Sequence, residues 1–279
     1  MKWSWLLLLA ACGEPAGGTA HAQVQWPAPE PCPPQAQWPE GMACVLGGVF
    51  TLGDDHGRPD ERGSGQVFVG TYYMDVHEAT NADYERCIDA GRCARPVRFR
   101  GFMAPNQPMV AVSWFDAVRA CELEGKRLPT EAEWERAASG TADTVFPWGN
   151  EPATCERANI DAPGRGRGCG RNRTAPVGGF PAGHFGISDM AGNVHEWVSD
   201  WYSPCLSGCT NECGAACLGV DPQGPCHGSS PCPGHTQRSV RGGSWYWPAS
   251  HARASARRGS GAQNRGPHRF GFRCARDLP

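Results

Sequence analysis

The chain has 279 residues, 19% of them charged, and its formal net charge is −2. This balance, together with the lack of any packed run of basic residues, argues against a nucleic-acid-binding protein. With 37 glycines and 25 prolines, the composition suits a domain rich in loops and argues against a helical bundle; the length suits one or two domains.

The N-terminus is typical of an exported protein. An apolar run over 3–11 follows Lys2 and is too short to span a bilayer, as in a secretory signal. The run ends in a sequence that resembles a bacterial lipobox, so residues 1–12 are predicted to be a lipoprotein-type signal with Cys12 as the lipid-bearing residue. Because Gly13 is not a retention-type Asp, the outer membrane of a bacterial envelope is the favoured location.

A second cleavage site after Ala22 leaves simple secretion open, with the protein in the periplasm or outside the cell. Residues 13–43 are rich in proline and are predicted to be a tether that separates the domain from a membrane.

The cysteines agree with export. Fifteen are present, and fourteen remain once Cys12 is set aside, an even number that suits disulfides in an oxidising compartment. Spacing alone favours three local pairs: Cys32–Cys44, Cys87–Cys93 and Cys155–Cys169. Within 203–237, a disulfide-stapled insertion is favoured over a metal-thiolate cluster; its cysteines are Cys205, Cys209, Cys213, Cys217, Cys226 and Cys232.

Three helices are indicated by their caps. Each follows a Ser or Thr, has an acidic residue at its third position and ends at a glycine. The predicted helices are 81–90 after Thr80, 114–124 after Ser113 and 131–139 after Thr130. Short strands are predicted over 45–52, 66–74 and 270–275, and the rest is irregular.

The stretch 186–201 carries oxygen donors on both sides of a glycine-initiated turn. Asn193 and Glu196 lie three residues apart, and the carbonyls of Gly192 and Val194 lie beside them. Since Ca²⁺ takes about 6–8 oxygen ligands from side chains and main chain, a short loop of this kind can bind it. The alternative is a hydrogen-bonded loop that leads into a buried tryptophan.

Four segments in order resemble the formylglycine-generating enzyme, or sulfatase-modifying factor, family. They are the opening strand Gly47-Gly48-Val49-Phe50-Thr51-Leu52-Gly53; the helix region Gly125-Lys126-Arg127-Leu128-Pro129-Thr130-Glu131-Ala132-Glu133-Trp134-Glu135 with Phe146-Pro147-Trp148-Gly149; Gly192-Asn193-Val194-His195-Glu196-Trp197 with Asp200-Trp201-Tyr202; and Arg241-Gly242-Gly243-Ser244-Trp245 through Gly271-Phe272-Arg273-Cys274. The resemblance implies one domain over 44–277, with an α+β, C-type-lectin-like fold of little regular secondary structure.

The resemblance also implies a set of bonds and ligands. It pairs Cys121 with Cys274 as a disulfide, and it supports structural calcium at Gly192, Asn193, Val194 and Glu196. A second family calcium site begins at Asn159 and Ile160, but no carboxylate stands just before Thr174 to complete it, so this site is doubtful.

Catalytic members of the family hold Cu(I) with two cysteines that follow the Gly-Gly-Ser motif, and they oxidise a substrate cysteine with O₂. Here those positions fall on Trp247 and Ala252, and 245–252 contains no cysteine. Because neither side chain supplies a thiolate, copper is not expected. No catalytic residue is assigned; the candidates in the expected cleft are Ser244, Trp247 and His251.

We therefore predict a non-copper binding domain whose cleft, rimmed by 244–258, takes a peptide, protein or glycan ligand, with no nucleic acid and with membrane attachment through the N-terminal lipid. The alternatives are an oxidoreductase with a different metal chemistry, or true formylglycine formation on sulfatases. The seven arginines from Arg253 to Arg276 are predicted to form internal ion pairs, with a polyanion site as their alternative.

Overall fold

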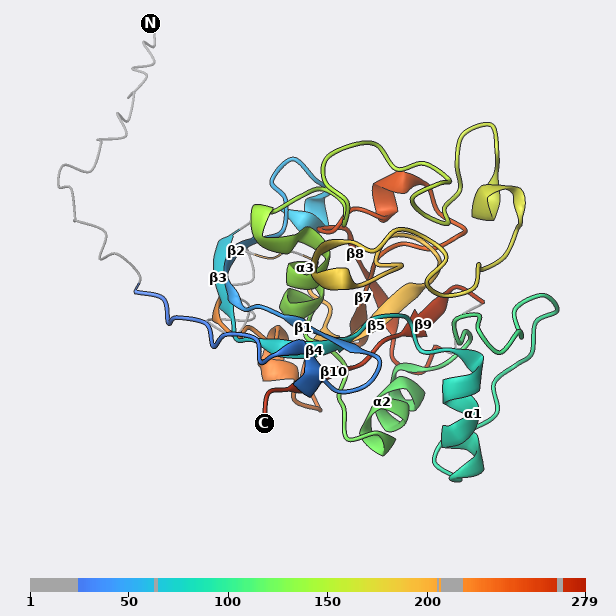
Figure 1. Ribbon diagram of the computed structural model, residues 1–279, viewed down its shortest axis with the longest axis horizontal. Helices are drawn as coiled ribbons and strands as arrows, with labels where there is room; N and C mark the ends of the chain where they lie inside the picture. Colours follow the sequence, from blue (N-terminus) through green and yellow to red (C-terminus); the bar gives the residue numbers. More distant parts are fainter. Residues whose placement is uncertain (1–24, 63–64, 205, 207–217, 265–267) are drawn as a thin grey trace, which may run out of the picture.

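The computed structural model describes residues 25–62, 65–204, 206, 218–264 and 268–279 (Figure 1). The predicted signal with Cys12, and the cysteines at 205, 209, 213 and 217, lie outside these residues. Within the described part, no helix combines the length and the apolar character that crossing a membrane requires.

The three predicted helices are confirmed almost to the residue. They are α1 (Asn81–Asp89), α2 (Trp114–Leu123) and α3 (Glu131–Ser139). Each begins with a complete capping box, in which the cap hydroxyl accepts from the third backbone N–H and the third carboxylate accepts from the cap N–H. The first two helices end one residue earlier than predicted.

In the described part of the chain, ten strands form three small sheets (Figure 1). The first has the order β1 (Met42–Val45), β4 (Tyr72–Asp75), β10 (Ala275–Asp277), and the second β2 (Gly48–Leu52), β3 (Gly65–Val69), β6 (Gly219–Val220). The third has the order β8 (Arg257–Gly261), β7 (Gln237–Arg241), β5 (His195–Trp201), β9 (Phe270–Phe272).

All three predicted strands are each divided between two sheets. The expected strand over 45–52 leaves the first sheet at Val45 and enters the second at Gly48, whose φ is +133°. A Cβ at Gly47 would lie 2.4 Å from the carbonyl oxygen of Val69, so only glycine allows the backbones to approach here. The chain therefore moves from one sheet to the next within two residues.

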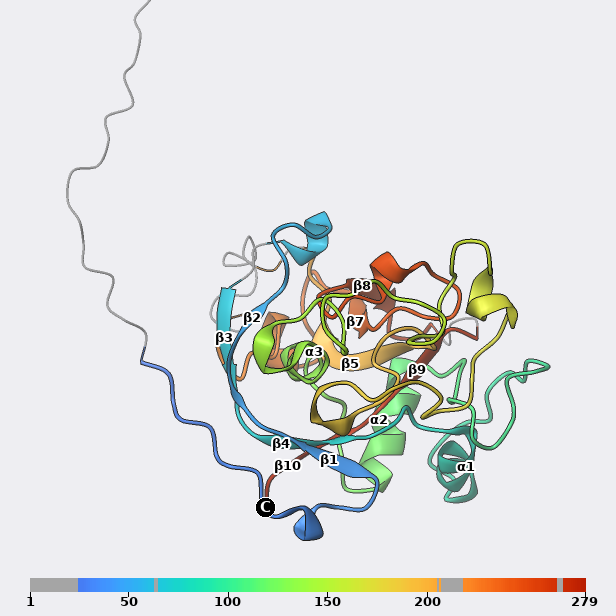
Figure 2. The same ribbon diagram turned by 45° about the horizontal axis from the view of Figure 1, so that its top comes forward.

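Helix α3 lies at the centre of the molecule, with β2 and β3 on one side and β5 and β7 on the other (Figure 2). All nine of its residues are buried. Trp134 packs with Tyr72, Met74 and Val198 in a core cluster that joins the first and third sheets. A second cluster lies between α1, α2 and the third sheet around Trp197 and Phe272.

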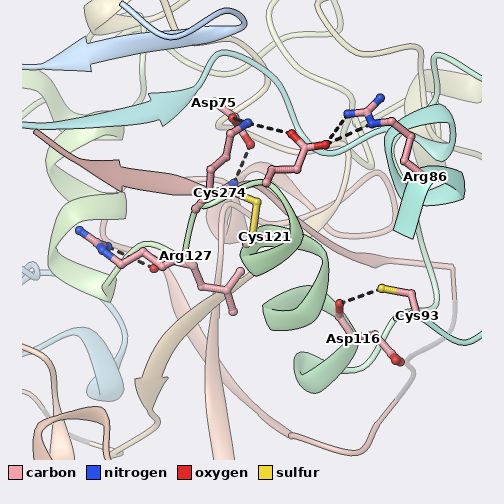
Figure 3. The surroundings of a disulfide bond; sticks show 10 residues. Asp75, Arg86, Cys93, Asp116, Cys121, Arg127 and Cys274 are labelled. Carbon is pink, nitrogen blue, oxygen red and sulfur yellow. Dashed lines mark hydrogen bonds and ion pairs between the residues drawn. A yellow bond between two sulfur atoms is a disulfide. The ribbon is translucent and has the colours of Figure 1, made fainter. Parts of the chain in front are cut away.

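Among the described residues, five disulfides fasten the irregular segments. Cys121 in α2 bonds Cys274, between β9 and β10, in the pairing that the resemblance implies (Figure 3). The three pairs favoured by spacing are also formed, and Cys226 bonds Cys232 within the insertion. These bonds account for all ten cysteines that the structure describes.

Candidate functional site

The segment after β7 makes a tight buried turn. Gly242 and Gly243 both have positive φ, and a Cβ at Gly243 would lie 2.7 Å from the carbonyl oxygen of His251. Ser244 is fully buried, and its Oγ accepts a long bond from the backbone N–H of Tyr246 at 3.4 Å. The hydroxyl of this candidate therefore belongs to the turn and faces no base.

Trp247 and Ala252 occupy the positions where the family resemblance places the copper ligands. Ala252 is 0% exposed and packs with Ala158, Ile160 and Ala191. The half-buried ring of Trp247 lies beside His251, with 4.9 Å between the ring centroids. The indole therefore fills space next to the turn, and the alanine position has no access to solvent.

His251 is held by an arginine from a distant loop. Its Nδ1 lies 3.0 Å from Nη1 of Arg58, an atom that can only donate. Burial lowers the pKa of His251, and the charges of Arg58 and Arg258 lower it further. The imidazole is therefore neutral and its Nδ1 is an acceptor, which leaves Nε2 as the ring nitrogen that carries the proton.

Cavities of about 630 and 680 Å³ lie elsewhere in the molecule. The first lies between β4, α1 and α2 beside His77 and Lys126, and the second lies around Trp114 and Ser199. Neither is lined by any residue of 244–258. The region predicted as the rim of a cleft is thus a face of half-buried aromatic side chains, not the wall of either large cavity.

Glu196 and Asn193 bond to different partners. Glu196 is fully buried and takes Arg273 in a two-point contact, with Nε–Oε2 at 2.7 Å and Nη2–Oε1 at 2.8 Å. Its Oε2 also accepts from the indole N–H of Trp134 at 2.7 Å. This carboxylate is therefore already neutralised, and the structure does not bring it together with Asn193 as a pair of metal ligands.

The carboxylate that faces Asn193 is Glu78, which the sequence reasoning missed. Glu78 Oε2 lies 2.6 Å from Asn193 Nδ2, and its Oε1 accepts from the backbone N–H of Val194 at 3.1 Å. Burial raises the pKa of Glu78 well above its usual value, and the nearby carboxylates of Asp189 and Glu196 raise it further. No local pattern marks this pairing, because 115 residues of sequence separate Glu78 from Asn193.

Asn159 completes this buried polar group, whereas Ile160 does not. Asn159 Nδ2 donates to Asn193 Oδ1 at 3.1 Å, and Asn159 Oδ1 is buried with no hydrogen-bond partner among the described residues. The carbonyl of Ile160 accepts from the backbone N–H of Cys169 at 3.0 Å, next to the Cys155–Cys169 disulfide. Among the described residues, no three His, Cys, Asp or Glu side chains are grouped so as to hold a metal. Calcium binding stays a prediction.

A second ionic network lies beneath α3. Arg257 forms a two-point contact with Glu131, with Nε–Oε1 at 2.8 Å and Nη2–Oε2 at 2.6 Å. Arg241 contacts the same Glu131 at 3.2 Å and also pairs with Glu135. All four side chains are buried, so these ion pairs brace α3 against β7 and β8. This agrees with the internal ion pairs expected for part of the arginine-rich segment.

The comparisons with known proteins agree on one family. The profile of the Sulfatase-modifying factor enzyme 1-like domain matches residues 28–278. The formylglycine-generating enzyme of Mus musculus is 31% identical over 293 residues, covering 85% of this chain and 75% of that protein. Serine/threonine-protein kinase pkn1 of Chlamydia pneumoniae is 32% identical over 280 residues, covering 92% of this chain and 40% of that protein.

The solved structures agree on the fold. The structure of PvdO from Pseudomonas aeruginosa superposes with a TM-score of 0.70 and 26% identity, covering 85% of this chain and 94% of that one. Treponema denticola variable protein 1 has a TM-score of 0.66 at 21% identity, covering 85% and 95%. The chain therefore belongs to the sulfatase-modifying factor family, related to formylglycine-generating enzymes, and has the family's single-domain, α+β, C-type-lectin-like fold.

Proposed function

We propose that this protein is an exported binding member of its family that does not form formylglycine with copper. The observation that carries the proposal is the chemistry of the turn after β7. No cysteine occurs over 245–252, and the family's two thiolate positions fall on Trp247 and Ala252. Cu(I) is held by soft sulfur ligands, which an indole and a methyl group cannot replace.

The state of the other cysteines supports this proposal. All ten described cysteines are in disulfides, so none of them offers a thiolate to a metal. Ala252 also packs among small apolar side chains, which supply no sulfur, nitrogen or oxygen ligand from their side chains at that position. Oxidation with a different metal has no observation in its favour.

The binding face would be formed by Tyr246, Trp247 and His251. All three are half-buried, and they follow one another along the segment that takes the place of the copper site. Aromatic side chains of this kind supply a large, rigid contact area for a peptide, a protein or a glycan. A lipid on Cys12 and the proline-rich segment before β1 would present this face in the cell envelope.

We also propose that a structural calcium ion binds beside Asn193. The donor set suits a hard cation, because Glu78 has no arginine or lysine bonded to it and Asn159 Oδ1 has no described partner. Glu78, Asn159 and Asn193 would hold the ion, whose charge would offset that of the buried Glu78. Glu196 would take no part, since it is bound to Arg273.

The experiment is a competition for Cu(I) between the protein and a chromophoric chelator, followed by incubation with a sulfatase cysteine peptide and O₂. We expect the wild-type protein to leave the chelator loaded and the peptide mass unchanged. A matched variant, Trp247→Cys with Ala252→Cys, restores the two thiols and should remove copper from the chelator. Copper capture or formylglycine formation by the wild-type protein contradicts the proposal.

A further inference from the structure

We propose that the face around Tyr246 and Trp247 binds an oxyanion of the ligand, a carboxylate, sulfate or phosphate, through the guanidinium groups of Arg167, Arg258 and Arg269. This inference deepens the proposed function and rests on it, because it assigns a chemical class to the ligand of the same face.

The two aromatic rings position the three guanidinium groups. The Cζ atoms of Arg167 and Arg269 lie 3.8 and 4.4 Å from the ring centroid of Tyr246. The Cζ of Arg258 lies 5.4 Å from the ring centroid of Trp247, and that of Arg269 lies 6.0 Å from the same centroid. These distances are typical of cation–π contacts. Three arginines from separate segments are thus gathered over two adjacent rings.

No carboxylate of the described part neutralises these three arginines by an ion pair. Asp161 is near in the fold, since its backbone N–H bonds the carbonyl of Trp247, but it forms no ion pair with a described arginine. Asp60 forms an ion pair with Arg58, and Glu61 forms ion pairs with Arg58 and Arg253. Among the described residues, the face therefore carries like charges close together with no carboxylate paired to them.

The electrostatics of the neighbouring groups agree with this arrangement. Burial lowers the pKa of Arg269, and the charges of Arg258 and Arg167 lower it further. The field at this face is positive.

One more donor at this face lacks a partner. The indole Nε1 of Trp247 is buried and has no hydrogen-bond acceptor among the described residues. A buried donor without an acceptor is costly, so an acceptor supplied by a ligand would stabilise it. An oxyanion meets both needs, because it accepts hydrogen bonds and carries the opposite charge.

The geometry favours oxyanions over other acceptors. A guanidinium group presents its donors in a planar fork that matches the paired oxygens of carboxylates, sulfates and phosphates. Stacking on a ring fixes the fork before the ligand arrives, so less side-chain freedom is lost on binding. A shared counter-ion would also offset the repulsion among the three like charges that the rings hold close together.

The test is calorimetric titration of the full chain with sulfate, phosphate and citrate, each against sodium chloride of equal ionic strength. We expect at least one of these anions to bind, and the order among them separates sulfate or phosphate esters from carboxylates as the ligand group. Arg258→Gln and Arg269→Gln should each weaken binding about tenfold or more, since each removes charge-assisted hydrogen bonds. Arg276→Gln removes the same charge from an exposed arginine on β10 and should leave binding unchanged.

Arg258→Lys is a second variant that keeps the test decisive if Arg258→Gln fails to fold. It keeps the charge and loses the fork, so we expect weaker binding with an unchanged melting temperature. The proposal is overturned if no anion binds beyond the chloride control, or if Arg258→Gln and Arg276→Gln reduce binding equally. Such a failure leaves the copper competition unchanged, whereas copper capture by the wild-type protein contradicts the proposed function even if anions bind.

Discussion

Arg257 and Arg258 are neighbours on β8, yet they lie in opposite surroundings. Side chains alternate across a strand, so the two guanidinium groups leave β8 on opposite faces. Arg257 enters the interior and grips Glu131 at two points. Arg258 is half-buried on the other face and lies over Trp247, with no ion pair to a described carboxylate.

This comparison shows that arginine has two roles in the molecule. Three of the buried arginines, Arg241, Arg257 and Arg273, each pair with a carboxylate from another element, which offsets the cost of burying their charge. The half-buried arginines, Arg258 and Arg269, have aromatic rings in place of carboxylates. Arginines of the first kind hold the fold together, and those of the second kind keep their charge available to a ligand.

The largest effect is expected for the buried set, in the variant Arg273→Ala. It leaves Glu196 fully buried with Trp134 as its remaining side-chain donor and should lower the free energy of unfolding by about 3–5 kcal/mol. Denaturant unfolding followed by tryptophan fluorescence measures it. A loss as small as that of a surface arginine would erase the distinction between the two sets.

A second effect concerns a carboxyl group close to Arg273. Burial raises the pKa of Asp189 to about 6. Because the folded protein holds this proton more tightly than the unfolded chain does, the protonated carboxyl stabilises the fold at low pH. This contribution to the free energy of unfolding, about 2–3 kcal/mol, is lost as the pH rises through about 6. Asp189→Asn keeps an acceptor for the N–H of Gly178 and should abolish this loss.

The measurement for Asp189 is the free energy of unfolding at pH 4 and at pH 8, with chelator present, for the wild-type protein and Asp189→Asn. We expect the free energy of unfolding of the wild-type protein to fall, relative to that of Asp189→Asn, as the pH rises from 4 to 8. Parallel pH curves for the two proteins would refute this assignment.

Arg257→Lys should have a smaller effect, about 1–3 kcal/mol, since the charge stays but the two-point contact with Glu131 is lost. Thermal unfolding by calorimetry measures the change. Arg119→Lys is a matched control, because Arg119 contacts Asp116 through one nitrogen and its side chain is 40% exposed. Equal losses in the two variants would show that the fork of Arg257 contributes nothing.

The smallest effect is expected for Arg258→Ala, within about 0.5 kcal/mol, because its side chain bonds no buried carboxylate. The same unfolding experiment measures it. A loss comparable to that of Arg273→Ala would place Arg258 among the structural arginines and remove the contrast on which the anion face depends.

The sequence reasoning succeeded where local signals decide the structure. The capping residues Thr80, Ser113 and Thr130 located all three helices, because a cap is a bond between residues three apart. The three local disulfides followed from spacing for the same reason. The long-range pairing of Cys121 with Cys274 came only from the family resemblance.

The reasoning failed where distant contacts decide. Strand β7 was missed because its sequence, Gln-Arg-Ser-Val-Arg, has no apolar alternation, although Arg238 and Arg241 are buried. They are tolerated there because Glu131 and Glu135 pair with Arg241, and because the rings of Trp114 and Trp201 enclose Arg238. The partnership of Glu78 with Asn193 spans more than a hundred residues of sequence, and no local pattern announces it.

The bond between Cys121 and Cys274 spans 153 residues, and the cysteine-rich insertion falls inside that span. A protease that cuts the chain once anywhere in the span yields two fragments that stay covalently joined. Such a nicked molecule keeps α2 attached to the last strands and separates only when the bond is reduced. A single cut within this span would then leave both parts of the domain in one molecule.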